Sequence, residues 1–346
     1  MSDSYNQFIQ CILITLIVIS LVFLINGCDS NPKEPDIPPE VLPELPISER
    51  DFQVGIAGII PRNYPNSTEE DYLLFTEEAK LVAEYVGPYA PWDDPGVTEG
   101  IEFVQYHVAD VKPLIALGFN MDSVEVGYFE RVRDSYREAV LEVVSDYQPE
   151  YIAVGVEVNR LIVEKSRDIF DEYVETYLHI YDAIREIDTQ TKIFATFQLE
   201  YMKGAAYLTG MEFEPHWDAL ESFDEKLDLV GLTVYPFLEY STVSEIPDGY
   251  YQEINQYIDK PVIIAEMGWL SQDVLTVEGS EQEQVDFVVD FLEASEDLNM
   301  ELMMYSFLYE PIGVEPLFSS IALKTNDGEE KEVYSYWRAL KELTMN

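Results

Sequence analysis

Cysteine, histidine and basic residues are scarce in this chain of 346 residues. It contains 2 cysteines, 3 histidines and 20 lysines and arginines against 67 aspartates and glutamates, so its formal net charge is −47. Because both cysteines, Cys11 and Cys28, lie near the N-terminus, the rest of the chain uses neither disulfides nor thiol chemistry. The acidic excess argues against nucleic acid as a partner, since an acidic surface repels phosphate. Adaptation to high salt and an ordinary acidic exported protein both remain open.

The motifs of several enzyme classes are also missing. The three histidines, His107, His179 and His216, show no H-E-x-x-H or paired spacing, so we expect no metal site and no cofactor. The absence of a G-x-S-x-G motif disfavours a serine hydrolase. No glycine-rich phosphate loop follows the first apolar run, which weakens the case for a doubly wound nucleotide-binding sheet.

The first 27 residues predict a signal peptide or a membrane anchor. Residues 11–25 form an unbroken apolar run, near the upper length of a signal-peptide core. Cys28 follows Asn26 and Gly27, an arrangement that resembles a bacterial lipobox, so Cys28 is a candidate lipidation site. The segment before the run has no lysine or arginine, which keeps an uncleaved anchor open. Either segment would hold the remaining chain at the outer face of a membrane.

Two further parts follow this segment. Residues 28–51 are rich in proline and acidic residues, which predicts a stiff, extended linker. From residue 52 to 346, apolar runs alternate with amphipathic stretches, which predicts one domain of the α/β class, a (β/α)₈ or TIM barrel. An open doubly wound sheet is the alternative. The eight predicted strands lie at 52–60, 85–92, 112–119, 152–157, 192–199, 227–237, 261–269 and 301–309.

Two glutamates stand at the ends of predicted buried strands. Glu157 follows an apolar run that starts at residue 152, and Glu266 ends the run from 261 in the same way. A charge there is costly unless it emerges from the sheet or finds a partner. Because active sites of such barrels lie at the carboxyl ends of the strands, the two glutamates suit a catalytic pair. The structural alternative is that each glutamate pairs with an arginine; Arg160 could steady Glu157 or anchor its loop.

Other polar and aromatic residues fall at the same predicted strand ends. Two carboxyl groups among aromatic rings suit glycoside cleavage, since one can protonate the leaving oxygen while the other attacks the anomeric carbon or activates water. Aromatic rings also pack against the C–H face of a sugar. The candidate substrate-binding residues are Trp92, Asn120, Asn159, Gln198, Tyr235, Trp269 and Phe307.

Three segments resemble retaining barrel glycosidases, and most closely the arabinogalactan endo-β-1,4-galactanase family. Residues 154–157 (VGVE) are similar to the VGNE-like motif of its fourth strand, and residues 231–237 (GLTVYPF) to the GxSxYPF-like motif of its sixth. Residues 265–269 (AEMGW) are similar to the E-x-G-W of cellulase- and β-1,3-glucanase-like members. The likeness covers the whole predicted barrel in order but is specific only at these segments.

The resemblance implies a role for three residues. It implies Glu157 as the general acid/base, Glu266 as the nucleophile, and Tyr235 as a partner that orients Glu266 or lines the sugar site. Val156 departs from the family pattern, where an asparagine binds the sugar 2-hydroxyl, a contact that strengthens in the transition state. Asn159 or Asn120 could substitute for it.

The sequence therefore predicts a monomeric, membrane-tethered retaining glycoside hydrolase that faces outward and cleaves a β-linked oligo- or polysaccharide. Its expected partners are the carbohydrate and the membrane. A carbohydrate-binding lipoprotein that kept the barrel and lost catalysis is the alternative that Val156 favours. A purely structural or adhesion domain is the third possibility.

Overall fold

The barrel is closed by parallel strands in the computed structural model, which describes residues 44–346 except 95, 206–207, 209, 211–212 and 224. Every ladder of its sheet is parallel, and the strand order is β7-β6-β5-β3-β2-β11-β10-β9-β8, with β4 beside β5. Only Ala195 separates β7 from β8, so both ends of this order belong to one stretch of chain, and the sheet closes on itself. The predicted (β/α)₈ barrel is confirmed.

All eight predicted strands are present, two of them in two pieces. The second strand is split into β3 and β4, and the fifth into β7 and β8. The strands are β2 (Gln53–Ile56), β3 (Tyr85–Val86), β4 (Tyr89–Pro91), β5 (Lys112–Gly118), β6 (Tyr151–Val154), β7 (Lys192–Phe194), β8 (Thr196–Gln198), β9 (Val230–Val234), β10 (Val262–Met267) and β11 (Met300–Tyr305).

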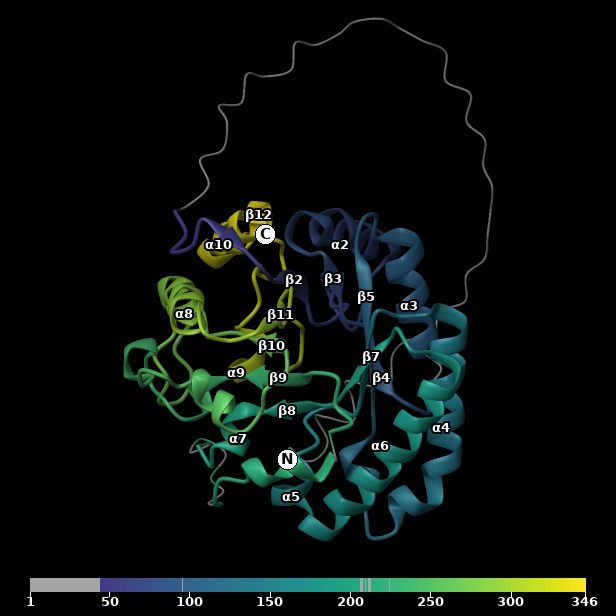
Figure 1. Cartoon of the computed structure of the whole chain (residues 1–346). Helices are drawn as coiled ribbons and strands as arrows, with labels where there is room; N and C mark the ends of the chain where they lie inside the picture. The colour runs from purple at the N-terminus through teal and green to yellow at the C-terminus, as the bar shows by residue number, and fades with distance from the viewer. Residues whose placement is uncertain (1–43, 95, 206–207, 209, 211–212, 224) are drawn as a thin grey trace, which may run out of the picture.

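Helices surround the strands (Figure 1). Six of the described helices have more than ten residues: α2 (Glu69–Val82), α3 (Gly96–His107), α4 (Tyr128–Tyr147), α6 (Arg167–Ile187), α8 (Glu281–Ala294) and α10 (Glu332–Glu342). The helices α4 and α6 lie side by side, with the rings of Phe129 and Tyr173 5.4 Å apart. Three short helices, α5 (Arg160–Glu164), α7 (Leu199–Met202) and α9 (Pro316–Ser319), lie in loops that follow strands.

Short helical turns replace long helices after the fifth and sixth strands. Among the described residues, α7 and the 3₁₀ turns at 217–219 and 221–223 follow β8, and 3₁₀ turns at 236–238, 243–245 and 252–256 follow β9. Proline at 236 and 247 and glycine at 249 interrupt any longer helix in the second segment. These segments bring irregular chain to the carboxyl end of the barrel.

The domain begins earlier than residue 52, which corrects the predicted boundary of the linker. Strand β1 (Glu49–Arg50) pairs in parallel with β12 (Thr344–Met345) at the other end of the chain. Arg50 is buried and its guanidinium donates to both carboxylate oxygens of Glu84, at 2.9 and 2.6 Å. The partly buried ion pair fixes this end of the chain to the barrel. The predicted targeting segment, Cys28 and most of the predicted linker lie outside the described residues.

The core consists of a shell between helices and strands and a separate cluster inside the barrel. The inner cluster is apolar from the amino end of the strands to their carboxyl end, and is formed by Tyr85, Leu114, Ala116, Tyr151, Ala153, Phe194, Leu229, Ile263, Ala265, Leu302 and Met304. Small residues near the carboxyl end, such as Ala116 and Ala265, leave space there. Among the residues that the structure describes, no helix is both long and apolar enough to cross a membrane.

Candidate active site

Glu157 reaches the carboxyl end of the barrel through a sharp turn after β6. Gly155 has φ +111° and leaves no room for a side chain, since an added Cβ would lie 2.3 Å from the hydroxyl of Tyr173. Glu157 itself has φ +49°, a conformation uncommon for a residue with a side chain. Its backbone N–H donates to Thr196 Oγ1 at 2.8 Å, which ties the turn to the neighbouring fifth strand. Backbone strain at such a position is typical of functional sites.

Two side chains donate to the carboxylate of Glu157. Thr233 Oγ1, from β9, donates to Oε1 at 2.8 Å, and Arg160 Nη1, from α5, donates to Oε2 at 2.7 Å. Arg160 also pairs with Glu164 at 2.7 Å, so its guanidinium bridges two acids. The Glu157 side chain is 15% exposed, and the salt bridge with Arg160 holds its carboxyl group in place. The steadying role considered for Arg160 is therefore present.

Glu266 lies one residue before the end of β10, where the register with β9 shifts. The hydroxyl of Tyr235, from the end of β9, donates to Glu266 Oε2 at 2.6 Å, which is one of the two roles that the family resemblance implied. The same hydroxyl lies 2.8 Å from Ser306 Oγ, which donates to the carbonyl of Met267 at 2.9 Å. The hydrogen bond from Tyr235 fixes the orientation of the Glu266 carboxyl.

The two glutamates are close enough to affect one another electrostatically. Burial, and then the negative charge of Glu157, raise the pKa of Glu266 to about 7, and the Tyr235 hydrogen bond and the positive charge of Arg160 offset only part of this. The carboxyls from strands four and seven, distant in sequence, therefore meet at one mouth of the barrel. Near neutral pH Glu266 is therefore partly protonated.

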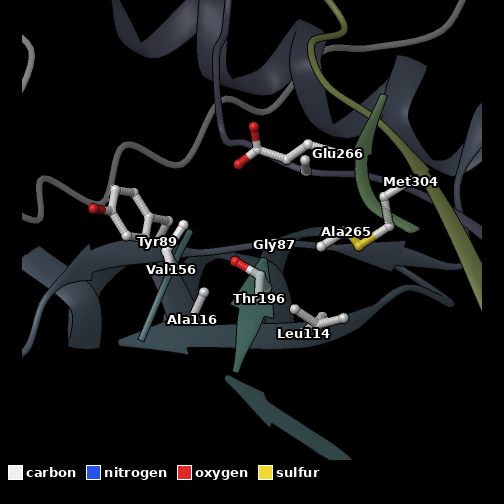
Figure 2. A pocket seen from close by; sticks show the side chains of 10 residues that line it. Gly87, Tyr89, Leu114, Ala116, Val156, Thr196, Ala265, Glu266 and Met304 are labelled. Atoms are coloured by element: carbon white, nitrogen blue, oxygen red, sulfur yellow. The ribbon is translucent and has the colours of Figure 1, made fainter. Parts of the chain in front are cut away.

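A pocket with a largely apolar floor lies beside Glu266, on the barrel axis. Figure 2 shows Glu266 projecting over it from β10, with Tyr89 on the opposite side. Its polar side chains are Tyr89, Thr196 and Glu266, and its other lining residues are Ala57, Gly87, Leu114, Ala116, Val156, Ala265 and Met304. Such a floor suits the C–H face of a sugar better than its hydroxyl groups, because a buried hydroxyl without a partner is costly.

Tyr89 is the aromatic residue that lines this pocket. It is 44% exposed and belongs to β4, and its hydroxyl points away from the pocket (Figure 2). Its ring lies directly on the backbone of Gly118, where an added Cβ would be 2.8 Å from a ring carbon. The ring is therefore supported by the third strand while part of it remains open to solvent. Tyr89 was not among the residues predicted from the sequence, because its strand is short and its neighbour Trp92 is the larger aromatic residue.

The prediction that Trp269 forms a sugar-stacking wall is wrong in this structure. Trp269 is 0% exposed, and its indole N–H donates to the carbonyl of Glu278 at 3.1 Å. Its ring packs against Phe237 and Phe287, with centroids 6.1 and 5.9 Å away. The helix α8 and the loop before it cover the indole, so no face is left for a sugar.

Asn159 and Gln198 are also buried, and they support the site from behind. Asn159 accepts from the backbone N–H of Gln198 at 2.8 Å and donates to its carbonyl at 2.9 Å, so it joins the Glu157 loop to the end of β8. The Gln198 side chain accepts from Tyr201 N at 2.6 Å and donates to Glu200. Neither side chain is available to a sugar, which corrects both predictions and removes Asn159 as a substitute for the missing asparagine at 156.

The remaining three candidates are partly buried and do not line the pocket. Asn120 Oδ1 accepts from Asp122 N at 3.0 Å and caps a 3₁₀ turn. Trp92 stacks on Tyr136 with ring centroids 5.4 Å apart. Phe307 packs against the hydrophobic core. Thr196 and Thr233, which the sequence analysis missed, instead contact Glu157; as threonines inside apolar strands they gave no distinctive signal.

The fold and the carboxyls at its mouth define a class, the barrel glycoside hydrolases. Among the described residues no group of three or more His, Cys, Asp or Glu side chains could hold a metal ion. The family model "Glycosyl hydrolase family 53" matches residues 134–330, more than half of the chain. The chain belongs to this family, which confirms the resemblance to the galactanases and the assignment as a glycoside hydrolase.

Comparison with solved structures shows the same fold. The GH53 catalytic domain of Ignisphaera aggregans aligns at 14% identity with a TM-score of 0.57, covering 88% of this chain and 100% of that one. The β-glucosidase of Thermotoga maritima aligns at 10% identity with a TM-score of 0.60, covering 87% of this chain and 100% of that one. The β-glucosidase of Exiguobacterium marinum aligns at 13% identity with a TM-score of 0.59, covering 85% and 98%. No curated protein matches the sequence.

Proposed function

We propose that this protein is a retaining glycoside hydrolase that cleaves a β-linked, galactan-like polysaccharide with Glu157 and Glu266. The observation that carries the proposal is that Glu157 and Glu266 come from the ends of the fourth and seventh strands, and that the charge of Glu157 helps to raise the pKa of Glu266, which lines a pocket. Retaining glycosidases use two such carboxyls, one as acid/base and one as nucleophile. Family membership supports the same reaction class.

In the proposed reaction, Glu157 protonates the glycosidic oxygen while Glu266 attacks the anomeric carbon, which gives a covalent glycosyl-enzyme and frees the leaving sugar. Glu157 then takes a proton from water, which attacks the anomeric carbon and releases Glu266. The raised pKa of about 7 favours a proton on Glu266 in the free site, so Glu266 must lose that proton before it can attack. In the second step Glu157 acts as a base, and there its salt bridge with Arg160 is favourable.

Chemical rescue distinguishes the two roles. Glu266→Ala with added azide should yield the α-glycosyl azide from an activated β-glycoside, because azide replaces the nucleophile on the α face. Glu157→Ala with azide should yield the β-glycosyl azide, because azide attacks the glycosyl-enzyme from the β face. The exchange of these two products would reverse the roles, and unaltered polysaccharide cleavage by either variant would remove the pair from the mechanism.

The substrate class can be tested with the native enzyme. We expect reducing-sugar release from β-1,4-galactan above that from β-glucan, β-mannan and xylan, with the β anomer appearing first by proton NMR. Tyr89 would form the aromatic platform for a sugar next to the cleaved bond. Binding to galactan with no release from any of these substrates would instead support the catalytically impaired carbohydrate-binding protein, for which Val156 in the pocket lining is the favouring observation.

We also propose that the enzyme is tethered to the outer face of a membrane. The apolar run at 11–25 and Cys28 motivate this, and the acidic composition suits an exposed location. Expression of the full chain with a metabolically incorporated fatty acid should label the native protein and not Cys28→Ser. Membrane association of an unlabelled Cys28→Ser variant would point to the uncleaved anchor, and a freely released native protein would contradict tethering.

A further inference from the structure

Glu200 is a fully buried carboxyl group that the proposed reaction does not use. It lies in α7, directly after the fifth strand, and is 0% exposed. Burial raises its pKa to about 7 in spite of several hydrogen bonds to it. A buried carboxyl is costly, so its presence calls for a specific set of partners.

The partners of Glu200 come from three segments. Its Oε2 accepts from the backbone N–H of Tyr235 at 3.1 Å and from the side-chain amide of Gln198, and its Oε1 accepts from the hydroxyl of Tyr250 at 3.1 Å. Tyr235 ends the sixth strand, Gln198 ends the fifth, and Tyr250 lies in the loop before the 3₁₀ turn at 252–256. All three donors are uncharged, so hydrogen-bond geometry and not an ion pair holds the Glu200 carboxyl in place.

These contacts continue to both proposed catalytic residues. Tyr235, whose N–H is held by Glu200, donates its hydroxyl to Glu266 at 2.6 Å. Gln198, on the other side, is clamped through its backbone by Asn159, two residues after Glu157. The Glu200 carboxyl is thus the point at which the two strand ends are joined.

We propose that Glu200 is a positioning residue that fixes the backbone of Tyr235 and, through the Tyr235 hydroxyl, the carboxyl of Glu266. This inference rests on the proposed function of Glu266. Other titratable groups surround Glu200: the buried Tyr250 and Tyr251, the half-buried Tyr240, and the ion pair of Lys203 with Glu253, which lies beside Tyr250.

Three substitutions of Glu200 test the proposal in the full chain. The amide of Glu200→Gln can still accept from Tyr235 N–H and can donate to a rotated Tyr250 hydroxyl, so kcat should stay within about threefold of native. Glu200→Leu removes every acceptor, and kcat should fall about a hundredfold, as expected when a preorganised hydrogen bond is misplaced. Glu200→Asp keeps a buried carboxyl but shortens its reach, so its kcat should lie between those of the Gln and Leu variants. This variant keeps the test possible if Glu200→Leu does not fold.

The pH profile separates positioning from a merely structural role. The Tyr235 hydrogen bond lowers the pKa of Glu266, so a displaced Tyr235 should raise it further. The acidic limb of kcat/KM should therefore move to higher pH in Glu200→Asp and Glu200→Leu, in the same direction as in Tyr235→Phe. Glu253→Gln, a carboxyl in the same region, is the matched control and should leave the limb in place.

Two results would overturn the positioning role. One is a folded Glu200→Asp variant with native kcat and an unmoved acidic limb; the other is a Glu200→Gln variant that loses as much activity as Glu200→Leu at equal melting temperature. If Glu266→Gln remains active, the proposed function itself is wrong. If Glu266→Gln is inactive and the Glu200 variants leave the limb in place, only this inference fails.

Discussion

The two ends of the barrel treat acidic side chains in opposite ways. At the amino end, Lys112 pairs with Glu150 at 2.8 Å, and Lys192 pairs with Glu301. Burial disfavours the charged form of Glu150, but Lys112 and the hydroxyl of Tyr85 outweigh it and hold its pKa below the ordinary value. Each acid there has a cation of its own and is open to solvent, so these charges close the amino end of the barrel at little cost.

At the carboxyl end the two carboxyls of the site are not balanced by cations in this way. Arg160 contacts Glu157 and not Glu266, and the pKa of Glu266 rises to about 7 through burial and the neighbouring charge. The same fold thus pairs acids with cations at one end and places two acids near each other at the other end. An unbalanced pair in a pocket is typical of a site that transfers protons, whereas a balanced pair is typical of structure.

Replacing one acid at each end of the barrel by glutamine should give the largest difference in kcat. Glu266→Gln should lower kcat by about a thousandfold or more, because the amide cannot act as the nucleophile. Glu301→Gln, the matched change at the amino end, should leave kcat within about twofold of native, since Glu301 lies at the opposite end of the strands from the pocket. Sugar release and circular dichroism of both variants test this; comparable losses in the two would end the contrast.

The pH dependence of kcat/KM shows whether Glu266 acts as the nucleophile or as the acid. With Glu266 as nucleophile and a pKa of about 7, kcat/KM should fall as the pH drops below 7. The fall approaches about tenfold per pH unit because only ionised Glu266 can attack. A stopped assay on an aryl β-galactoside, over about five pH units from about pH 4 to about pH 9, measures this fall in kcat/KM. Loss of kcat/KM as the pH rises through 7 would make Glu266 the acid instead.

Tyr89 should matter for binding more than for chemistry. Tyr89→Ala should raise KM for the polysaccharide about tenfold with a smaller change in kcat, because its ring supplies contact area and its hydroxyl points away from the pocket. Tyr106→Ala, a 73% exposed tyrosine on α3, is the matched control and should change nothing. Gly118→Ala should reproduce the KM effect by displacing the ring. An unchanged KM in Tyr89→Ala would exclude the platform.

The smallest effect is expected at the amino end. Lys192→Met removes the cation that Glu301 pairs with, and the Lys192 side chain is 39% exposed. The cost in unfolding free energy should be about 1 kcal/mol or less, as for other solvent-accessible ion pairs. Denaturant unfolding measures it, and kcat should not change. A loss of activity without loss of stability would show that the two ends are coupled.

The strands were predictable from the sequence because strands buried on both faces are continuous apolar runs. The runs at 112–119, 152–157 and 261–269 matched observed strands in this way. The hydrogen bond between Tyr235 and Glu266 was expected from the family resemblance. Trp269 and Asn159 were misjudged because position at a strand end does not say whether a loop or helix covers the side chain, and α8 and the β8 end cover these two.

The sequence alone determined the alternation of strands and helices and the acids at the strand ends, since both follow from local patterns of apolar and charged residues. The tertiary structure decided which groups face each other: Arg160 beside Glu157, Tyr235 beside Glu266, and Tyr89 over Gly118 in place of Trp269. The physical reason is that pairing, burial and proton affinity depend on distances between segments far apart in the chain. Those distances exist only once the barrel has closed.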